Sequence, residues 1–109
     1  MQLTSFGYDK SVDLRQVWHD QMVIDDNERW LLTLIAYDCV GYRWGLIELW
    51  VGKEPAYMSY QEMMLQFTRV KLWVVEGDYT NTIVRAMEIW REDNLVDLAI
   101  AKLRELKSK

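Results

Sequence analysis

The segment from residue 28 to residue 52 constrains the fold most, because it is apolar on every face whichever secondary structure it adopts. Its sequence is ERWLLTLIAYDCVGYRWGLIELWVG. A run of this kind has no period that distinguishes a helix from a strand. We favour two buried helices broken at Gly41, because Asp25 stands three residues before Glu28 in a capping pattern.

The alternative for the same segment is a β-hairpin with strands near 30–38 and 43–51. Aromatic and β-branched residues, which are enriched in strands, support it. Gly45, inside the second half, also suits a strand that another backbone approaches closely. Both interpretations place this segment in the core.

An amphipathic helix is predicted over residues 60–76. Apolar residues recur there at helical spacing: Met63, Met64, Phe67, Val70 and Val74. Ser59 with Glu62 forms a capping box at its start, and Gly77 stands where a helix C-cap is expected.

Three further helices are predicted from caps and apolar spacing. One starts after Asp78 or Thr80, and another is capped by Asp93 or Asn94. The third lies near the N-terminus and is capped by Ser11. The residues expected to face inward are Leu14, Val17, Trp18 and Met22 in the N-terminal helix, Ile83, Ala86, Met87 and Trp90 in the next, and Leu95, Leu98, Ala99, Leu103 and Leu106 in the last.

The predicted fold class is therefore all-α, a compact antiparallel helical bundle or a short helical-hairpin stack of about five to six helices. The alternative is an α+β fold with a β-hairpin at about 30–51 packed on helices. Residues 1–109 are expected to form a single domain.

Composition excludes several classes of function and of location. The net charge is −4, from 17 acidic and 13 basic side chains, so we expect no direct binding to a nucleic-acid backbone. Asp38 and Arg43 interrupt the longest apolar stretch, and the first residues lack the pattern of a signal peptide, so no membrane contact is expected. Cys39 is the only cysteine, which suits a reducing compartment, and we predict a cytoplasmic protein.

Residues that carry catalysis or bind metals are scarce. His19 is the only histidine, and Cys39 lies in the most apolar segment, where a thiol is usually an inert packing residue. The carboxylates near the first turn lack the spacing of a calcium loop: Asp20, Asp25, Asp26 and Glu28. The five glycines are isolated, so no phosphate loop is present. We therefore predict no catalytic, cofactor or metal site, and a protein that is not an enzyme.

A second apolar set in the predicted 60–76 helix suggests a partner-binding surface. Leu65, Leu72 and Trp73 lie off its main apolar face, beside Arg69. These four residues cover either neighbours in the same chain or an interface, and Trp beside Arg is typical of interface hot spots.

The leading hypothesis is a small acidic cytoplasmic protein-binding module of the inhibitor, immunity or adaptor type, which docks on a larger protein or associates with itself. One alternative is a small-molecule binder or enzyme with an aromatic-lined pocket. Its lining would come from Trp18, Trp30, Tyr37, Tyr42, Arg43 and Trp44. The other alternative is a structural subunit of a homo-oligomer.

Overall fold

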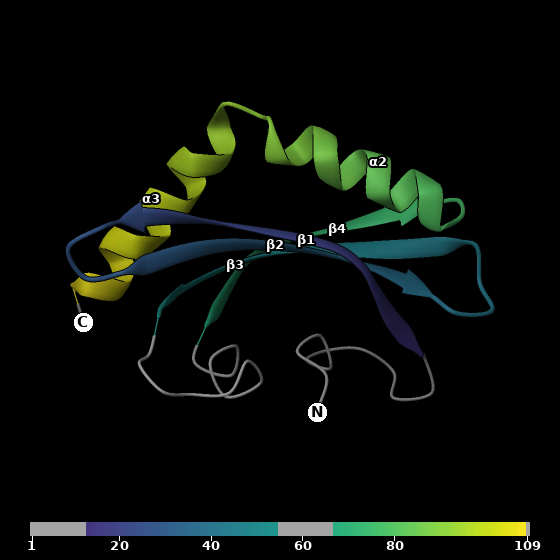
Figure 1. The fold of residues 1–109 in the computed structure, drawn as a ribbon, viewed down its shortest axis with the longest axis horizontal. Helices are drawn as coiled ribbons and strands as arrows, with labels where there is room; N and C mark the ends of the chain where they lie inside the picture. The colour runs from purple at the N-terminus through teal and green to yellow at the C-terminus, as the bar shows by residue number, and fades with distance from the viewer. Residues whose placement is uncertain (1–12, 55–66, 109) are drawn as a thin grey trace.

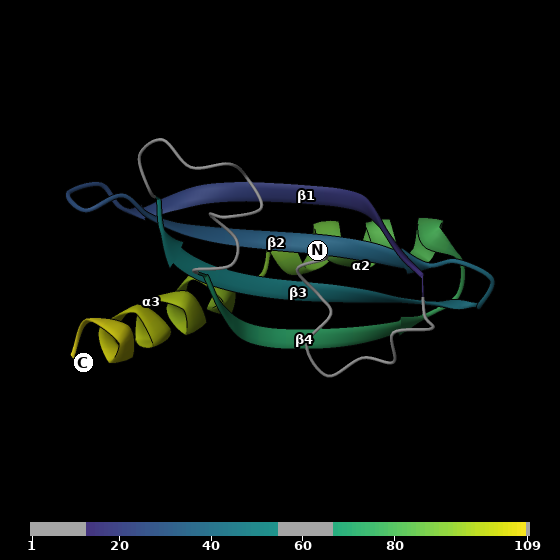
Figure 2. The same cartoon turned by 90° about the horizontal axis from the view of Figure 1, so that it is seen from below.

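Over the described residues, two helices cover one face of a four-stranded antiparallel sheet (Figure 1). The computed structural model describes residues 13–54 and 67–108. The strands are β1 (Leu14–Asp25), β2 (Trp30–Cys39), β3 (Trp44–Lys53) and β4 (Thr68–Glu76), and they lie in the order β1-β2-β3-β4 (Figure 2). The helices α2 (Tyr79–Trp90) and α3 (Asn94–Lys107) follow one another along the same face. Neither of these helices is long and apolar enough to cross a membrane.

The prediction of an all-α helical bundle is wrong, and the largest correction falls on residues 28–52. They form the hairpin of β2 and β3, close to the alternative that placed strands near 30–38 and 43–51. The two strands are buried on both faces of the sheet. Strands buried on both sides read as continuous apolar runs, which is why this segment shows no alternation.

The predicted N-terminal helix is also wrong, because its residues form β1. A register shift between Gln16 and Trp18 inserts an extra residue, Val17, and both Val17 and Trp18 pack toward the helices. Such a bulge breaks the two-residue alternation of a strand. Apolar residues separated by bulges therefore imitate the three- and four-residue spacing of a helix.

The helix expected over residues 60–76 is wrong over its described part for the same reason. Thr68–Glu76 is the strand β4. Lys71 pairs with Leu49 and Arg69 with Trp50, so Val70 is the extra residue of a bulge. Ser59, Glu62, Met63, Met64 and Leu65 lie outside the described residues.

The two C-terminal helices are confirmed. The carboxylate of Asp78 accepts a hydrogen bond from the backbone N–H of Asn81 and caps α2. Asp93 precedes α3 but makes no side-chain capping hydrogen bond. The break between α2 and α3 allows both helices to turn their apolar sides to the sheet.

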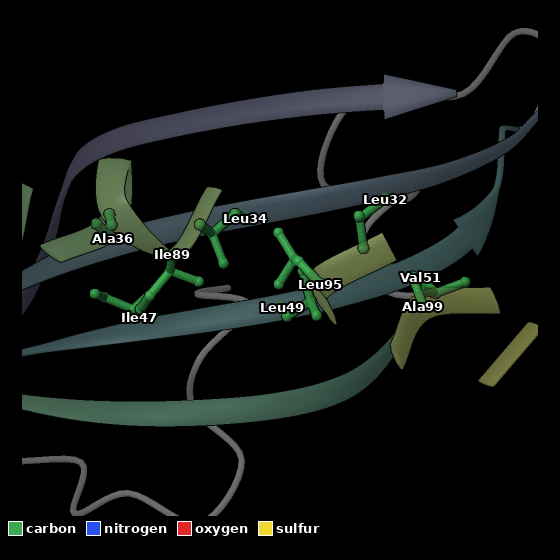
Figure 3. Close-up of a cluster of buried hydrophobic side chains, with 10 residues drawn as sticks. Leu32, Leu34, Ala36, Ile47, Leu49, Val51, Ile89, Leu95 and Ala99 are labelled. Atoms are coloured by element: carbon green, nitrogen blue, oxygen red, sulfur yellow. The ribbon is translucent and has the colours of Figure 1, made fainter. Parts of the chain in front are cut away.

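The core has two layers, one on each face of the sheet. On the helix face, side chains of β2 and β3 meet those of both helices (Figure 3): Leu32, Leu34, Ala36, Ile47, Leu49, Val51, Ala86, Ile89, Leu95 and Ala99. The other cluster lies on what we call the opposite face and consists of Leu14, Leu31, Ile35, Tyr37, Cys39, Leu46, Trp50 and Phe67.

Gly45 allows α2 to approach the sheet closely. A Cβ atom at this position would lie 2.2 Å from Oγ1 of Thr82, a buried residue of α2. The start of α2 is therefore held next to the start of β3. This contact places the β2–β3 turn, the end of β4 and the start of α2 at one end of the molecule (Figure 1).

Candidate functional site

The predicted partner-binding residues do not share one face. Leu65 lies outside the described residues. Arg69, Leu72 and Trp73 lie on β4, at an edge of the sheet. Leu72 packs against the cluster of the opposite face, whereas Trp73 packs against the cluster of the helix face. The strand therefore separates side chains that a helix would have grouped.

Arg69 binds a carboxylate inside the fold. Its Nη1 atom donates to Oε2 of Glu48 over 2.8 Å, and Glu48 is 0% exposed. Glu48 stands between Ile35 and Leu72 in the sheet register, among apolar neighbours. A buried carboxylate requires a cation beside it, because desolvation otherwise makes the charged form unfavourable. Arg69 therefore has a structural role as the cation beside the buried carboxylate of Glu48.

An open groove lies at the end of the sheet that carries the β2–β3 turn. Its volume is about 880 Å³, and its lining is Arg43, Trp44, Leu46, Val74, Glu76 and Gly77. We call its apolar members, Trp44, Leu46 and Val74, the floor of the groove; Arg43 and Glu76 add one charge of each sign. Val74 is 66% exposed, a high value for a valine within a strand.

The groove is shaped by the junction of β4 and α2. The backbone N–H of Gly77 donates to the carbonyl of Arg43 over 2.9 Å and extends the pairing of β3 with β4. Gly77 then turns the chain with a φ of +113°, which favours glycine. Beyond the turn, Asp78 caps α2.

Tyr42 stands beside the groove at the β2–β3 turn. Its ring centroid is 6.5 Å from that of Trp44, with an angle of 48° between the rings. Tyr42 is 61% exposed. An exposed tyrosine packed on a half-buried tryptophan combines apolar area with a polar tip, as binding surfaces commonly do.

The six residues expected to line an aromatic pocket are distributed over several places. Trp18 packs edge-on against Trp90 of α2, with centroids 6.3 Å apart. Trp30 faces the helices, and Tyr37 is buried on the opposite face. Only Arg43 and Trp44 line the groove, with Tyr42 next to them.

Sequence reasoning missed Leu46, Val74 and Glu76 as groove residues. Val74 was expected on the inward face of a helix, and Leu46 was part of the undecided apolar segment. The exposure of Val74 follows only from the strand alternation after the bulge at Val70. Tyr42 and Arg43, which are exposed in the β2–β3 turn, were the residues by which the sequence indicated this site.

Cys39 and His19 do not form a catalytic pair. Cys39 is 1% exposed, and burial, followed by the charges of Asp38 and Asp13, raises the pKa of its thiol. His19 is exposed and hydrogen-bonded to Gln16 over 2.9 Å. Cys39 pairs with Leu14 while His19 pairs with Ile35, so the two lie several residues apart along the sheet.

The carboxylates near the β1–β2 turn bind a lysine. Lys107, at the end of α3, donates to Asp25 and lies 3.2 Å from Glu28. Its hydrogen bond lowers the pKa of Asp25 and that of Glu28, and these acids raise the pKa of Lys107. Within the described ranges, histidine, cysteine and acidic side chains form no group suited to a metal ion.

Comparisons with protein-family models, with curated proteins and with solved structures found no match to this chain.

Proposed function

We propose that this chain is a small acidic protein-binding module of the inhibitor, immunity or adaptor type, and that the groove beside Trp44 docks a larger protein. The observation that carries the proposal is the exposure of Val74 and Tyr42 next to the apolar floor of an open groove. Single exposed apolar residues are ordinary on protein surfaces. Their convergence on one concave site is typical of interaction surfaces.

The charge of the chain supports a partner with a basic surface. The net charge is −4, and long-range attraction to a basic protein would accelerate encounter. Glu76 on the groove wall would then meet a basic side chain, while Arg43 would bind an acidic one at the rim. A cytoplasmic location is part of this proposal, since Cys39 is unpaired and a reducing compartment suits it.

A protein ligand fits the groove better than an enclosed small molecule does. Small-molecule pockets bury most of the ligand surface. This groove is open to solvent, and the aromatic residues that would have enclosed a ligand lie on two faces of the sheet. No catalytic role belongs to the proposal.

The test is a matched pair of tyrosine truncations. Tyr42→Ala removes the ring packed on Trp44 of the groove lining, whereas Tyr79→Ala removes a ring of similar exposure, 50% against 61%, from the first turn of α2. A protein captured from the native host by the unaltered chain is purified, and its affinity for each variant is measured by calorimetry. Truncating a hot-spot residue is expected to weaken binding about 30-fold.

The expected result is a loss of this size for Tyr42→Ala and little change for Tyr79→Ala. Equal affinities for the two variants would overturn the assignment of the groove. Failure of the unaltered chain to retain any specific protein would overturn the proposed function itself.

A further inference from the structure

We propose that a second copy of this chain pairs with β4 in antiparallel register about a twofold axis, so that two four-stranded sheets join into one. This association concerns the edge of the sheet and goes beyond the proposed docking in the groove, with which it shares Val74 and Glu76. The backbone N–H and C=O groups of β4 that point away from β3 make this pairing possible.

The outward groups of β4 follow from the pairing of β3 with β4. The N–H of Gly77 points to Arg43, its register partner. Because bonding direction alternates along an antiparallel strand, the backbone groups of Leu72, Val74 and Glu76 point outward instead. No described residue hydrogen-bonds to these outward groups. An edge of this kind is a template for another strand.

The other edge of the sheet is less suited to pairing. β1 has register shifts after Gln16 and after Val23, and its exposed side chains are mostly polar. Bulges and charged side chains are the features by which edge strands avoid pairing. β4 has one bulge, at Val70; after Lys71 it is regularly paired and apolar from Leu72 to Val75.

One antiparallel register gives the apolar and charged side chains of β4 complementary neighbours in the second copy. With Trp73 opposite Trp73 of the second copy, Leu72 stands opposite Val74, and both lie on the opposite face of the sheet. This register also places outward backbone groups against outward ones, as a hydrogen-bonded pair requires. The exposed Val74 then gains an apolar neighbour, and two tryptophans meet on the helix face, where cross-strand aromatic pairs stabilise sheets.

The charges of β4 are complementary in the same register. Arg69 and Lys71 stand near its start and Glu76 at its end, so antiparallel pairing brings the basic start beside the acidic end. Because Val70 is the extra residue of the bulge, Arg69 takes the place opposite Glu76 of the second copy. A register shifted by two residues, with Leu72 opposite itself, would instead place Val74 opposite Arg69.

The first test is sedimentation of the unaltered chain from micromolar to millimolar concentration, beside Val74→Pro and Val74→Thr. Proline removes the outward N–H of residue 74 without removing a bond to β3, and threonine keeps that N–H. We expect the unaltered chain to dimerise reversibly. Val74→Pro should weaken dimerisation about 30-fold, since two backbone hydrogen bonds are lost per pair, while Val74→Thr retains most of it.

The second test fixes the register by cross-linking in a Cys39→Ala background. Trp73→Cys places thiols directly opposite each other, within reach of a disulfide. Val75→Cys is the matched control, because its register partner is Lys71 and the two introduced thiols are about 14 Å apart along the strand. With oxidised glutathione as oxidant, only Trp73→Cys should form a covalent dimer.

A chain that stays monomeric at every concentration would overturn the pairing, as would a dimer that Val74→Pro leaves unaffected. Equal cross-linking of both cysteine variants would overturn the register. Failure here is distinct from failure of groove docking, because the latter is measured as affinity for another protein and depends on Tyr42.

Discussion

Glu48 and Arg69 form an ion pair that links the centre of the sheet to its edge. The carboxylate is 0% exposed and lies 2.8 Å from the guanidinium. The attraction within such a pair offsets the desolvation of both groups, so the pair by itself adds little net stability. Removing Arg69 is different, because the buried carboxylate of Glu48 then loses the guanidinium that offsets its desolvation.

Arg69→Met is therefore expected to lower the free energy of unfolding by about 3 kcal/mol, the size typical of a broken buried pair. Urea unfolding followed by tryptophan fluorescence measures this change. Lys71→Met is the matched control two residues along β4, where the side chain is exposed, and a change within about 0.5 kcal/mol is expected there. Equal effects of the two substitutions would show that Arg69 is not the counter-ion of Glu48.

α3 is joined to the far end of the sheet by the ion pairs of Lys107. Asp25 ends β1, and Glu28 follows in the turn to β2, so one lysine connects the last turn of the helix to this hairpin. Pairing lowers the pKa of both acids below their ordinary values of 3.8 and 4.5. Their contribution to stability is thus complete above those values and is lost as the pH falls through the lowered ones.

Lys107→Met is expected to raise the pKa of Asp25 part of the way to its ordinary value, because the largest cause of its shift is the hydrogen bond from this lysine. Carbon NMR titration of the side-chain carboxyls measures the change. Lys102→Met is the control, since Lys102 pairs with Glu105 of the same helix at 3.3 Å. An unchanged pKa of Asp25 in Lys107→Met would mean that α3 does not reach this turn.

The elements differ in how far their sequences reveal them. α2 and α3 were predicted because each has one apolar side and a recognisable start, such as Asp78. β1 and β4 were missed because the extra residues Val17 and Val70 disrupt the alternation that identifies a strand. The β2–β3 hairpin stayed ambiguous because both of its faces are buried, which removes the polar half of any pattern.

The groove could be predicted only in part, since it is a product of tertiary structure. Tyr42, Arg43 and Trp44 were recognised as candidate binding residues from the sequence. Leu46 and Val74 join them because β3 and β4 pair there. Val74 lies on the surface beside Trp44 because of this register, which the sequence alone does not reveal.

Three features of the molecule depend on β4 being a strand that pairs with β3: the groove, the Glu48–Arg69 ion pair and the place of β4 at the edge of the described sheet. The register places Leu46 opposite Val74 and Glu48 opposite Leu72. Both pairs are of the non-hydrogen-bonded type, in which Cα atoms approach to about 4.5 Å. Backbone protons across such pairs are close enough for NMR to detect.

A nuclear Overhauser spectrum of the labelled chain tests this pairing most directly. We predict cross-strand contacts between the α protons of Leu46 and Val74 and between those of Glu48 and Leu72. Contacts from each residue to the third one along the chain over residues 68–76, without any contact to β3, would instead identify a helix and contradict the pairing on which the site is built.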